Sequence, residues 1–237
     1  MRPHSPTGNS LWLVAEKIVF LFISFGVNLL LARHLQPGLF GTLSFLLAAV
    51  TVLMPIMALG LNSLVTRELM RRPDETTSIL GSVIGVRLLA GLLIAALAVL
   101  AAQLLLPPSH RILFAVLVVA SISQGFFVID FWLQARSANR YGVIVRLAVL
   151  LSASIARLVA IYLDAGIDTF VYLLCAEWLV LALCYCQLYR RYGGLFTKLT
   201  LTRLETTHLL RQSRWLWFTA IAAVLVLKVD QLMLAYL

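Results

Sequence analysis

Apolar runs long enough to cross a bilayer alternate with short polar breaks along the 237 residues of the chain. The first run, residues 11–32, can span a hydrocarbon core of roughly 30 Å at about 1.5 Å per residue. Short breaks between such runs imply antiparallel neighbours. The pattern therefore predicts an all-α polytopic transmembrane helix bundle of about seven spans. Its expected helices lie near residues 10–32, 40–62, 79–106, 111–134, 142–163, 168–189 and 214–237.

Turn-forming and helix-breaking residues divide these runs. Gln36-Pro37-Gly38 separates the first two runs, Pro107-Pro108 the third and fourth, and Asp164-Ala165-Gly166 the fifth and sixth. Within the third run, Gly81 and Gly85 lie one helical turn apart. This spacing predicts close packing against that helix.

The longest break, between residues 190 and 214, is rich in Lys and Arg. Such a segment can be a linker, an interfacial amphipathic helix or a partner site. We interpret it as a linker because the sequence after it, from Gln212 to Leu216, echoes that from Asn9 to Leu13. This predicts a six-helix bundle over residues 1–190, a basic cytoplasmic linker over 191–213, and the first helix of a second bundle over 214–237. We expect that second bundle to be truncated, because the last apolar run still continues at Leu237.

The composition excludes a soluble domain. Hydrophobic residues make up 62% of the chain and charged residues only 12%, whereas a soluble domain has about 25% charged residues. The net charge of +9 comes from basic residues that lie between apolar runs rather than in one patch. Contact with anionic membrane lipids therefore explains the charge better than nucleic acid does.

The distribution of Lys and Arg among the breaks predicts the orientation. The N-terminus and the second, fourth and sixth breaks hold most of them, whereas the first and third hold only Arg33 and Arg111. Because basic loops stay on the cytoplasmic side, the chain is expected to be a multi-pass membrane protein with a cytoplasmic N-terminus.

Motifs for metal binding or catalysis are not found in the sequence. The cysteines Cys175, Cys184 and Cys186 share one apolar run, and the four histidines have no ligand spacing. No nucleophile elbow, P-loop or His–carboxylate cluster occurs, and no large loop could hold a sugar donor. We therefore expect no metal, no cofactor and no enzyme activity.

Charged residues inside the apolar runs are the candidate site. The cations Lys17, Arg87, Arg157 and Lys228 are expected to line a cationic lumen that suits an anionic ligand, such as a phosphate or pyrophosphate headgroup. The acids Glu16, Glu177, Asp230 and Asp130 are candidates for binding a coupling H⁺ or Na⁺. Structural alternatives remain. Glu16–Lys17 and Lys228–Asp230 can simply hold helices together, and Asp130 and Arg146 lie close enough to an interface to reach water.

The stretch from Leu30 to Phe45, LLARHLQPGLFGTLSF, resembles the end of the first helix in the polysaccharide (O-antigen) flippase family of the multidrug/oligosaccharidyl-lipid/polysaccharide exporter superfamily. His34 and Gln36 depart from that pattern, which has an aromatic residue and a glycine there. Three more stretches fit the same family: Leu59-Gly60-Leu61 with Arg67-Glu68, Asp130 to Ala135 with Tyr141, and Lys228 to Leu234. The resemblance covers the whole chain.

The resemblance implies a function in the bacterial cytoplasmic (inner) membrane. The protein would move an undecaprenyl-pyrophosphate-linked oligosaccharide between leaflets for surface polysaccharide synthesis, as in O-antigen and lipopolysaccharide assembly, by ion-coupled alternating access. The chain would form the first bundle of a two-bundle exporter fold, with other polysaccharide-assembly membrane proteins as partners. The alternatives are a multidrug/cation antiporter of the same superfamily and a truncated remnant that does not transport.

Overall fold

The computed structural model describes residues 6–136, 138–193, 196 and 199–233, without the side chains of residues 6–15, 63 and 228–233. The described chain is helical. Its elements are α1 (Pro6–Ala58), α2 (Leu61–Arg71), η1 (Pro73–Glu75), α3 (Thr76–Leu105), α4 (Pro108–Ser121), η2 (Ile122–Phe127), α5 (Val128–Ala135), α6 (Asn139–Tyr162), α7 (Ile167–Tyr192) and α8 (Arg203–Met233).

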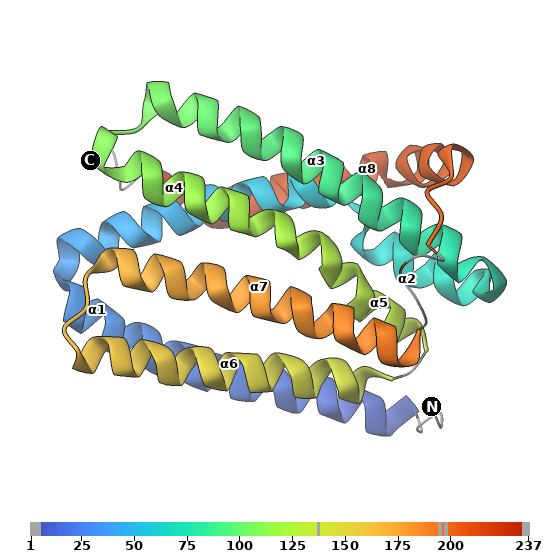
Figure 1. Cartoon of the computed structure of the whole chain (residues 1–237), viewed down its shortest axis with the longest axis horizontal. Coiled ribbons are helices and arrows are strands. Elements are labelled where there is room, and N and C mark those ends of the chain that lie inside the picture. The colour runs from blue at the N-terminus through green and yellow to red at the C-terminus, as the bar shows by residue number, and fades with distance from the viewer. Residues whose placement is uncertain (1–5, 137, 194–195, 197–198, 234–237) are drawn as a thin grey trace.

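The long helices lie side by side and reverse direction at two ends (Figure 1). Five stretches of the described chain are long and apolar enough to cross a membrane: Glu16–Ala58, Pro73–Leu105, Pro108–Ala135, Asn139–Tyr162 and Ile167–Tyr192. The predicted all-α, polytopic membrane bundle is therefore confirmed.

Helix α1 contains the first two predicted runs and is sharply kinked where the break was expected. Gln36 has φ 60° and ψ 166°, and Pro37 follows it. The two arms of α1 run in opposite directions on either side of this kink (Figure 1). His34, which replaces an aromatic residue of the family pattern, still packs edge-on against Phe170, and its Nε2 atom lies 3.0 Å from the carbonyl oxygen of Ala165. The kink is thus fastened to the turn between α6 and α7.

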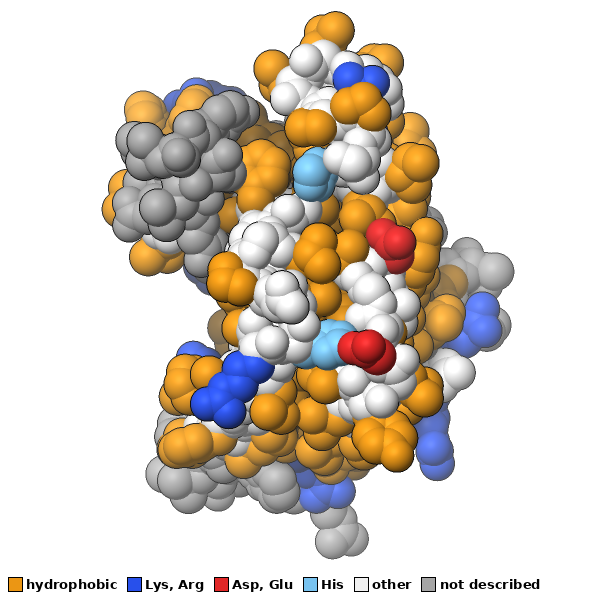
Figure 2. Space-filling model, turned by 90° about the vertical axis from the view of Figure 1, so that its left-hand side faces the viewer, with side chains coloured by type: hydrophobic (Ala, Val, Ile, Leu, Met, Phe, Trp, Pro, Cys, Tyr) orange, Lys and Arg blue, Asp and Glu red, His pale blue; other side chains and the backbone are white. Residues whose placement is uncertain are grey.

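The two ends of the bundle differ in charge. One end carries the kink of α1 and the turns from α3 to α4 and from α6 to α7, and Figure 2 shows hydrophobic side chains there, mixed with uncharged surface and a few basic, acidic and histidine side chains. The opposite end carries α2, η1 and the connection from α5 to α6. It holds the exposed basic residues Arg67, Arg71, Arg136, Arg190 and Arg191.

Helix α8 begins at Arg203, inside the segment expected to be a linker, and packs along α1. The residues just before it lie directly on α3. A Cβ atom at Gly81 would come within 2.6 Å of the Thr200 backbone, and one at Gly85 within 2.3 Å of Leu201. Ser82 Oγ accepts a hydrogen bond of 3.2 Å from the Thr202 N–H. Gly81 and Gly85 therefore do allow close packing, but against a non-helical segment.

A cluster of ion pairs joins α2 to the start of α8. The Arg72 guanidinium donates to Glu205 at 2.7 and 3.1 Å, to Glu68 at 3.0 and 3.2 Å, and to Glu75 at 2.7 Å. Hydrogen bonding to Glu205 raises the pKa of Arg72 above its ordinary value. Glu68 and Glu205 are buried. This cluster fixes the start of α8 to the end of α2.

Candidate functional site

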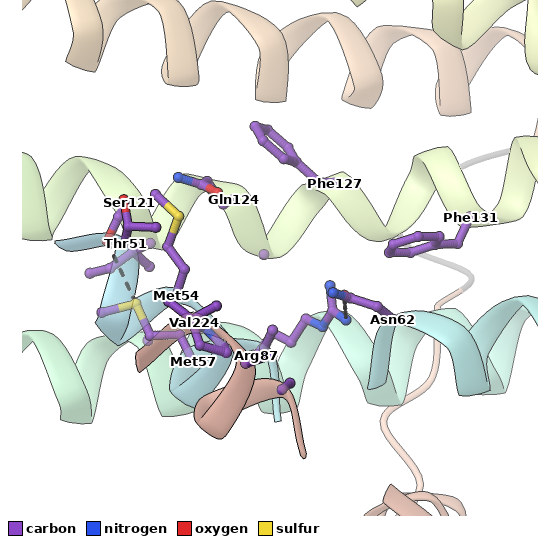
Figure 3. Close-up of a pocket in the computed structure, with 17 residues that line it drawn as sticks. Thr51, Met54, Met57, Asn62, Arg87, Ser121, Gln124, Phe127, Phe131 and Val224 are labelled. Carbon is purple, nitrogen blue, oxygen red and sulfur yellow. Dashed lines mark hydrogen bonds between the residues drawn. The ribbon is translucent and has the colours of Figure 1, made fainter. Parts of the chain in front are cut away.

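A cavity of about 540 Å³ lies inside the bundle, where the second arm of α1, α3, η2 and α8 meet (Figure 3). Its walls are mostly apolar. The lining residues are Thr51, Met54, Pro55, Met57, Ala58, Asn62, Arg87, Gly91, Ser121, Ile122, Gln124, Gly125, Phe127, Phe131, Ala220, Ala223 and Val224. Arg87 is charged, and the other described residues of this lining are uncharged.

Arg87 is only 5% exposed and lacks a carboxylate partner among the described contacts. Its Nη2 atom donates to Asn62 Oδ1 at 2.5 Å, and its guanidinium lies 5.9 Å from the centre of the Phe131 ring. Asn62 reaches this position because Gly60, with φ 65°, turns the chain between α1 and α2. Figure 3 shows the Arg87 side chain extending toward Asn62.

Two buried polar atoms in the cavity wall have no hydrogen-bond partner, Arg87 Nε and Gln124 Nε2. Leaving such donors unsatisfied costs about 1–3 kcal/mol each. A buried cation with a spare N–H suits a ligand with negatively charged oxygen atoms, and Gln124 offers a second spare donor in the same cavity wall. The cavity can therefore hold an anionic group next to apolar surface.

A second charged cluster surrounds Arg146 on α6. Its Nε and Nη2 atoms donate to the two carboxylate oxygens of Glu16 on α1, the second at 2.8 Å. Its Nη1 atom donates to Asp130 on α5 and to the hydroxyl oxygen of Tyr185 at 3.0 Å. Gln134 donates to the other Asp130 oxygen at 2.9 Å. The Arg146 guanidinium thus joins α6 to α1, α5 and α7.

Gly142 makes room for this cluster. It lies one turn before Arg146 on α6, and a Cβ atom there would come within 2.5 Å of Asp130 Oδ1. The absence of a side chain lets Asp130 approach α6 closely enough to reach Arg146.

A third pair, Arg157 on α6 and Glu177 on α7, joins neighbouring helices by an ion pair. The two side chains are 13% and 17% exposed. The pair links α6 to α7, and removing one partner would leave an uncompensated charge in a medium of low dielectric constant.

The three predicted cations whose side chains the structure describes do not share one site. Arg87 lines the cavity, Arg157 pairs with Glu177, and Lys17 is exposed. The side chains of Lys228 and Asp230 lie outside the described residues. Of the predicted acids, Glu16 and Asp130 meet at Arg146, whereas Glu177 is separate. Glu16 pairs with Arg146 on α6 and so joins two helices, as the structural alternative for this residue allowed.

Sequence reasoning missed the neutral members of these sites. Asn62 and Tyr185 accept hydrogen bonds from Arg87 and Arg146, and Gln124 lines the Arg87 cavity. The available signal was weak: each is a polar group inside an otherwise apolar run. Arg146 was considered only as a residue near an interface, and the structure makes it the centre of a cluster.

Comparison with protein families gives a match. The model of a family described as polysaccharide biosynthesis protein matches residues 7–237. No curated protein and no solved structure gives a significant match.

Proposed function

The chain belongs to the polysaccharide biosynthesis protein family, as the resemblance predicts, and from this membership we propose that it is a transporter rather than an enzyme. Its proposed cargo is an undecaprenyl-pyrophosphate-linked oligosaccharide. The cargo would cross the bacterial cytoplasmic membrane by alternating access, for O-antigen or related surface polysaccharide synthesis.

The observation that carries this proposal is the buried Arg87 in the cavity. A pyrophosphate group presents several charged oxygen atoms, which a guanidinium grips well. The apolar lining, including Met54, Met57 and Val224, suits the isoprenoid carbons next to that group. A multidrug/cation antiporter would instead favour acidic groups in the cavity, so the positive charge of Arg87 argues against that alternative.

We propose that the acids of the two ion-paired clusters take part in coupling. Protonation of Glu16 or Asp130 would weaken its bond to Arg146 and loosen the contact between α1, α5 and α6. Protonation of Glu177 would likewise weaken its ion pair with Arg157. A proton or Na⁺ that competes for these carboxylates would therefore favour a different helix arrangement. Lys17, Lys228 and Asp230 stay in the proposal as further lumen charges.

The proposed orientation puts the basic end of the bundle and the N-terminus in the cytoplasm. Anionic lipids would contact this end, and other polysaccharide-assembly membrane proteins would be partners. We propose that residues 1–190 form a first bundle and that α8, which begins at Arg203, is the first helix of a second bundle.

The test is surface polysaccharide in cells whose only copy of the gene carries Arg87→Ala. Loss of one charged hydrogen-bonding group is worth about 1.5–3 kcal/mol, so we expect polysaccharide to fall at least roughly tenfold at unchanged protein level. The control is Arg33→Gln, which changes an exposed arginine beside the kink of α1. Normal polysaccharide in the Arg87→Ala cells would refute the proposed site.

A further inference from the structure

The wall of the Arg87 cavity includes the start of a helix. Helix α2 has 11 residues and begins directly after Gly60. Ala58 and Asn62, on either side of this beginning, both line the cavity. Figure 3 shows Asn62 in the first turn of α2, with its side chain next to the guanidinium of Arg87. The positive end of the α2 dipole therefore lies beside a buried cation.

This arrangement is electrostatically unfavourable. Backbone N–H groups in the first turn of a helix have no helical acceptor and carry partial positive charge. Among the described residues no side chain caps α2, and its first turn contains no acid. Arg87 adds a full positive charge at 5% exposure, where water screens the repulsion only weakly. An anion between Arg87 and the start of α2 would offset both positive charges.

Gly60 fixes the position of the α2 start. Its φ of 65° lies in the left-handed region, which glycine adopts without strain. A Cβ atom at Gly60 would come within 2.5 Å of the backbone nitrogen of Trp217 on α8. Glycine therefore lets the start of α2 lie directly against α8. The donors of the first turn are held in place before a ligand arrives, which lowers the entropic cost of binding.

Asn62 offers two further donors. An arginine can only donate, so the Asn62 Oδ1 atom accepts from Arg87, and the amide nitrogen Nδ2 lies on the other branch of the side chain. That nitrogen carries two N–H groups, and Asn62 is exposed. Arg87 Nε has no partner among the described residues. The Asn62 amide can therefore hold Arg87 through its oxygen and a ligand through its nitrogen.

We propose that Asn62 and the start of α2 bind the pyrophosphate of the cargo together with Arg87. The anionic oxygens accept hydrogen bonds from the Asn62 amide and from backbone N–H groups of the first turn. This inference rests on the proposed function, because it assigns further contacts to the same ligand. Helix starts and guanidinium groups both bind phosphate oxygens well. An uncharged lipid such as undecaprenol gains nothing from either.

The first test is amide hydrogen exchange of the purified full chain in nanodiscs, read by mass spectrometry from overlapping peptides across residues 60–66. The probes are undecaprenyl pyrophosphate and undecaprenol. We expect the pyrophosphate to slow exchange of the first-turn amides by roughly tenfold, because a hydrogen-bonded N–H exchanges only after that bond opens. Undecaprenol should leave their exchange unchanged. The start of α7 at Ile167, outside the cavity lining, is the control and should not respond to either lipid.

The second test is Asn62→Asp, whose carboxylate would pair with Arg87 and take the place of the ligand anion at the helix start. We expect thermal stability without ligand to equal or exceed that of wild type, since an acid in the first turn of a helix is stabilising. Affinity for undecaprenyl pyrophosphate should fall at least roughly tenfold. The matched control is Gln212→Glu. Gln212 also accepts from an arginine, Arg67 at 3.1 Å, but is outside the cavity lining, so this variant should bind as wild type.

The results separate this inference from the proposed function. Binding of the pyrophosphate without slower exchange at the start of α2, or wild-type affinity of Asn62→Asp, would overturn the inference. The proposed function would still stand in that case if Arg87→Gln loses affinity for the pyrophosphate. Wild-type affinity of Arg87→Gln would instead refute the proposed site itself.

Discussion

Arg87 and Arg146 are both arginines inside long apolar helices, but their surroundings differ. The Arg146 guanidinium is held by two carboxylates and a tyrosine hydroxyl, so its charge is balanced within the protein. Arg87 has the neutral Asn62 as its hydrogen-bond partner and keeps an unpartnered Nε in a cavity. An unbalanced charge in such a place is costly, and the anionic ligand that we propose would offset that cost. Arg146 serves the packing of the helices.

The packing around Arg146 depends on Gly142. We predict that Gly142→Ala lowers thermal stability in detergent by about 1–3 kcal/mol, because the added methyl group overlaps Asp130 and pushes it from Arg146. The control is Gly26→Ala on α1, where an added Cβ has open space. That variant should be neutral or slightly stabilising, since alanine favours helix. Equal melting temperatures for Gly142→Ala and wild type would contradict the account of this cluster.

The sequence could predict which residues are unusual but not which of them meet. A charge inside an apolar run is visible in the sequence alone, and Glu16, Arg87, Arg157 and Glu177 were found that way. Glu16 and Arg146 are 130 positions apart, so their pairing depends on how α1 packs on α6. The separation of Arg87 from Arg157 is likewise a consequence of helix packing, which local patterns do not determine.

At the scale of elements, the positions where helices break were easier to predict than the segments against which they pack. The sequence Gln36-Pro37-Gly38 predicted the kink of α1, because proline interrupts a helix locally. In the structure, Gln36 has a positive φ at this kink. The start of α8 was placed too late, since residues 203–213 are polar enough to be taken for a linker but form helix on the basic end of the bundle. Tertiary contacts of Gly81, Ser82 and Arg72 hold that segment.

We predict that the Arg72 cluster controls local opening of this segment. Arg72→Ala leaves the buried Glu68 and Glu205 without their shared partner. Because Arg72 is itself partly exposed, we expect a cost of about 1–2 kcal/mol, or roughly tenfold faster amide hydrogen exchange over residues 203–212. Exchange in α7 should not change. Arg71→Ala, at the exposed neighbouring position, is the control, and unaltered exchange in Arg72→Ala would argue against the cluster as the fastening of α8.

At the scale of the whole molecule, the two ends of the bundle differ in charge, and this difference predicts its orientation. Thr77, at the start of α3, and Ser109, at the start of α4, are both exposed and lie at opposite ends. In a variant without native cysteines, we expect Ser109→Cys to react with an impermeant thiol reagent in intact cells. Thr77→Cys should react only after the membrane is opened. The reverse pattern would mean that the basic end faces outward.

The central claim is that the bundle binds an anionic lipid-linked group at Arg87. Its most direct test is equilibrium binding of undecaprenyl pyrophosphate, against uncharged undecaprenol, to the purified chain in nanodiscs. Wild type should prefer the pyrophosphate, and Arg87→Gln should lose roughly ten- to one-hundredfold in affinity for it, while Arg33→Gln binds as wild type. Equal affinity of wild type and Arg87→Gln for the pyrophosphate would contradict the claim.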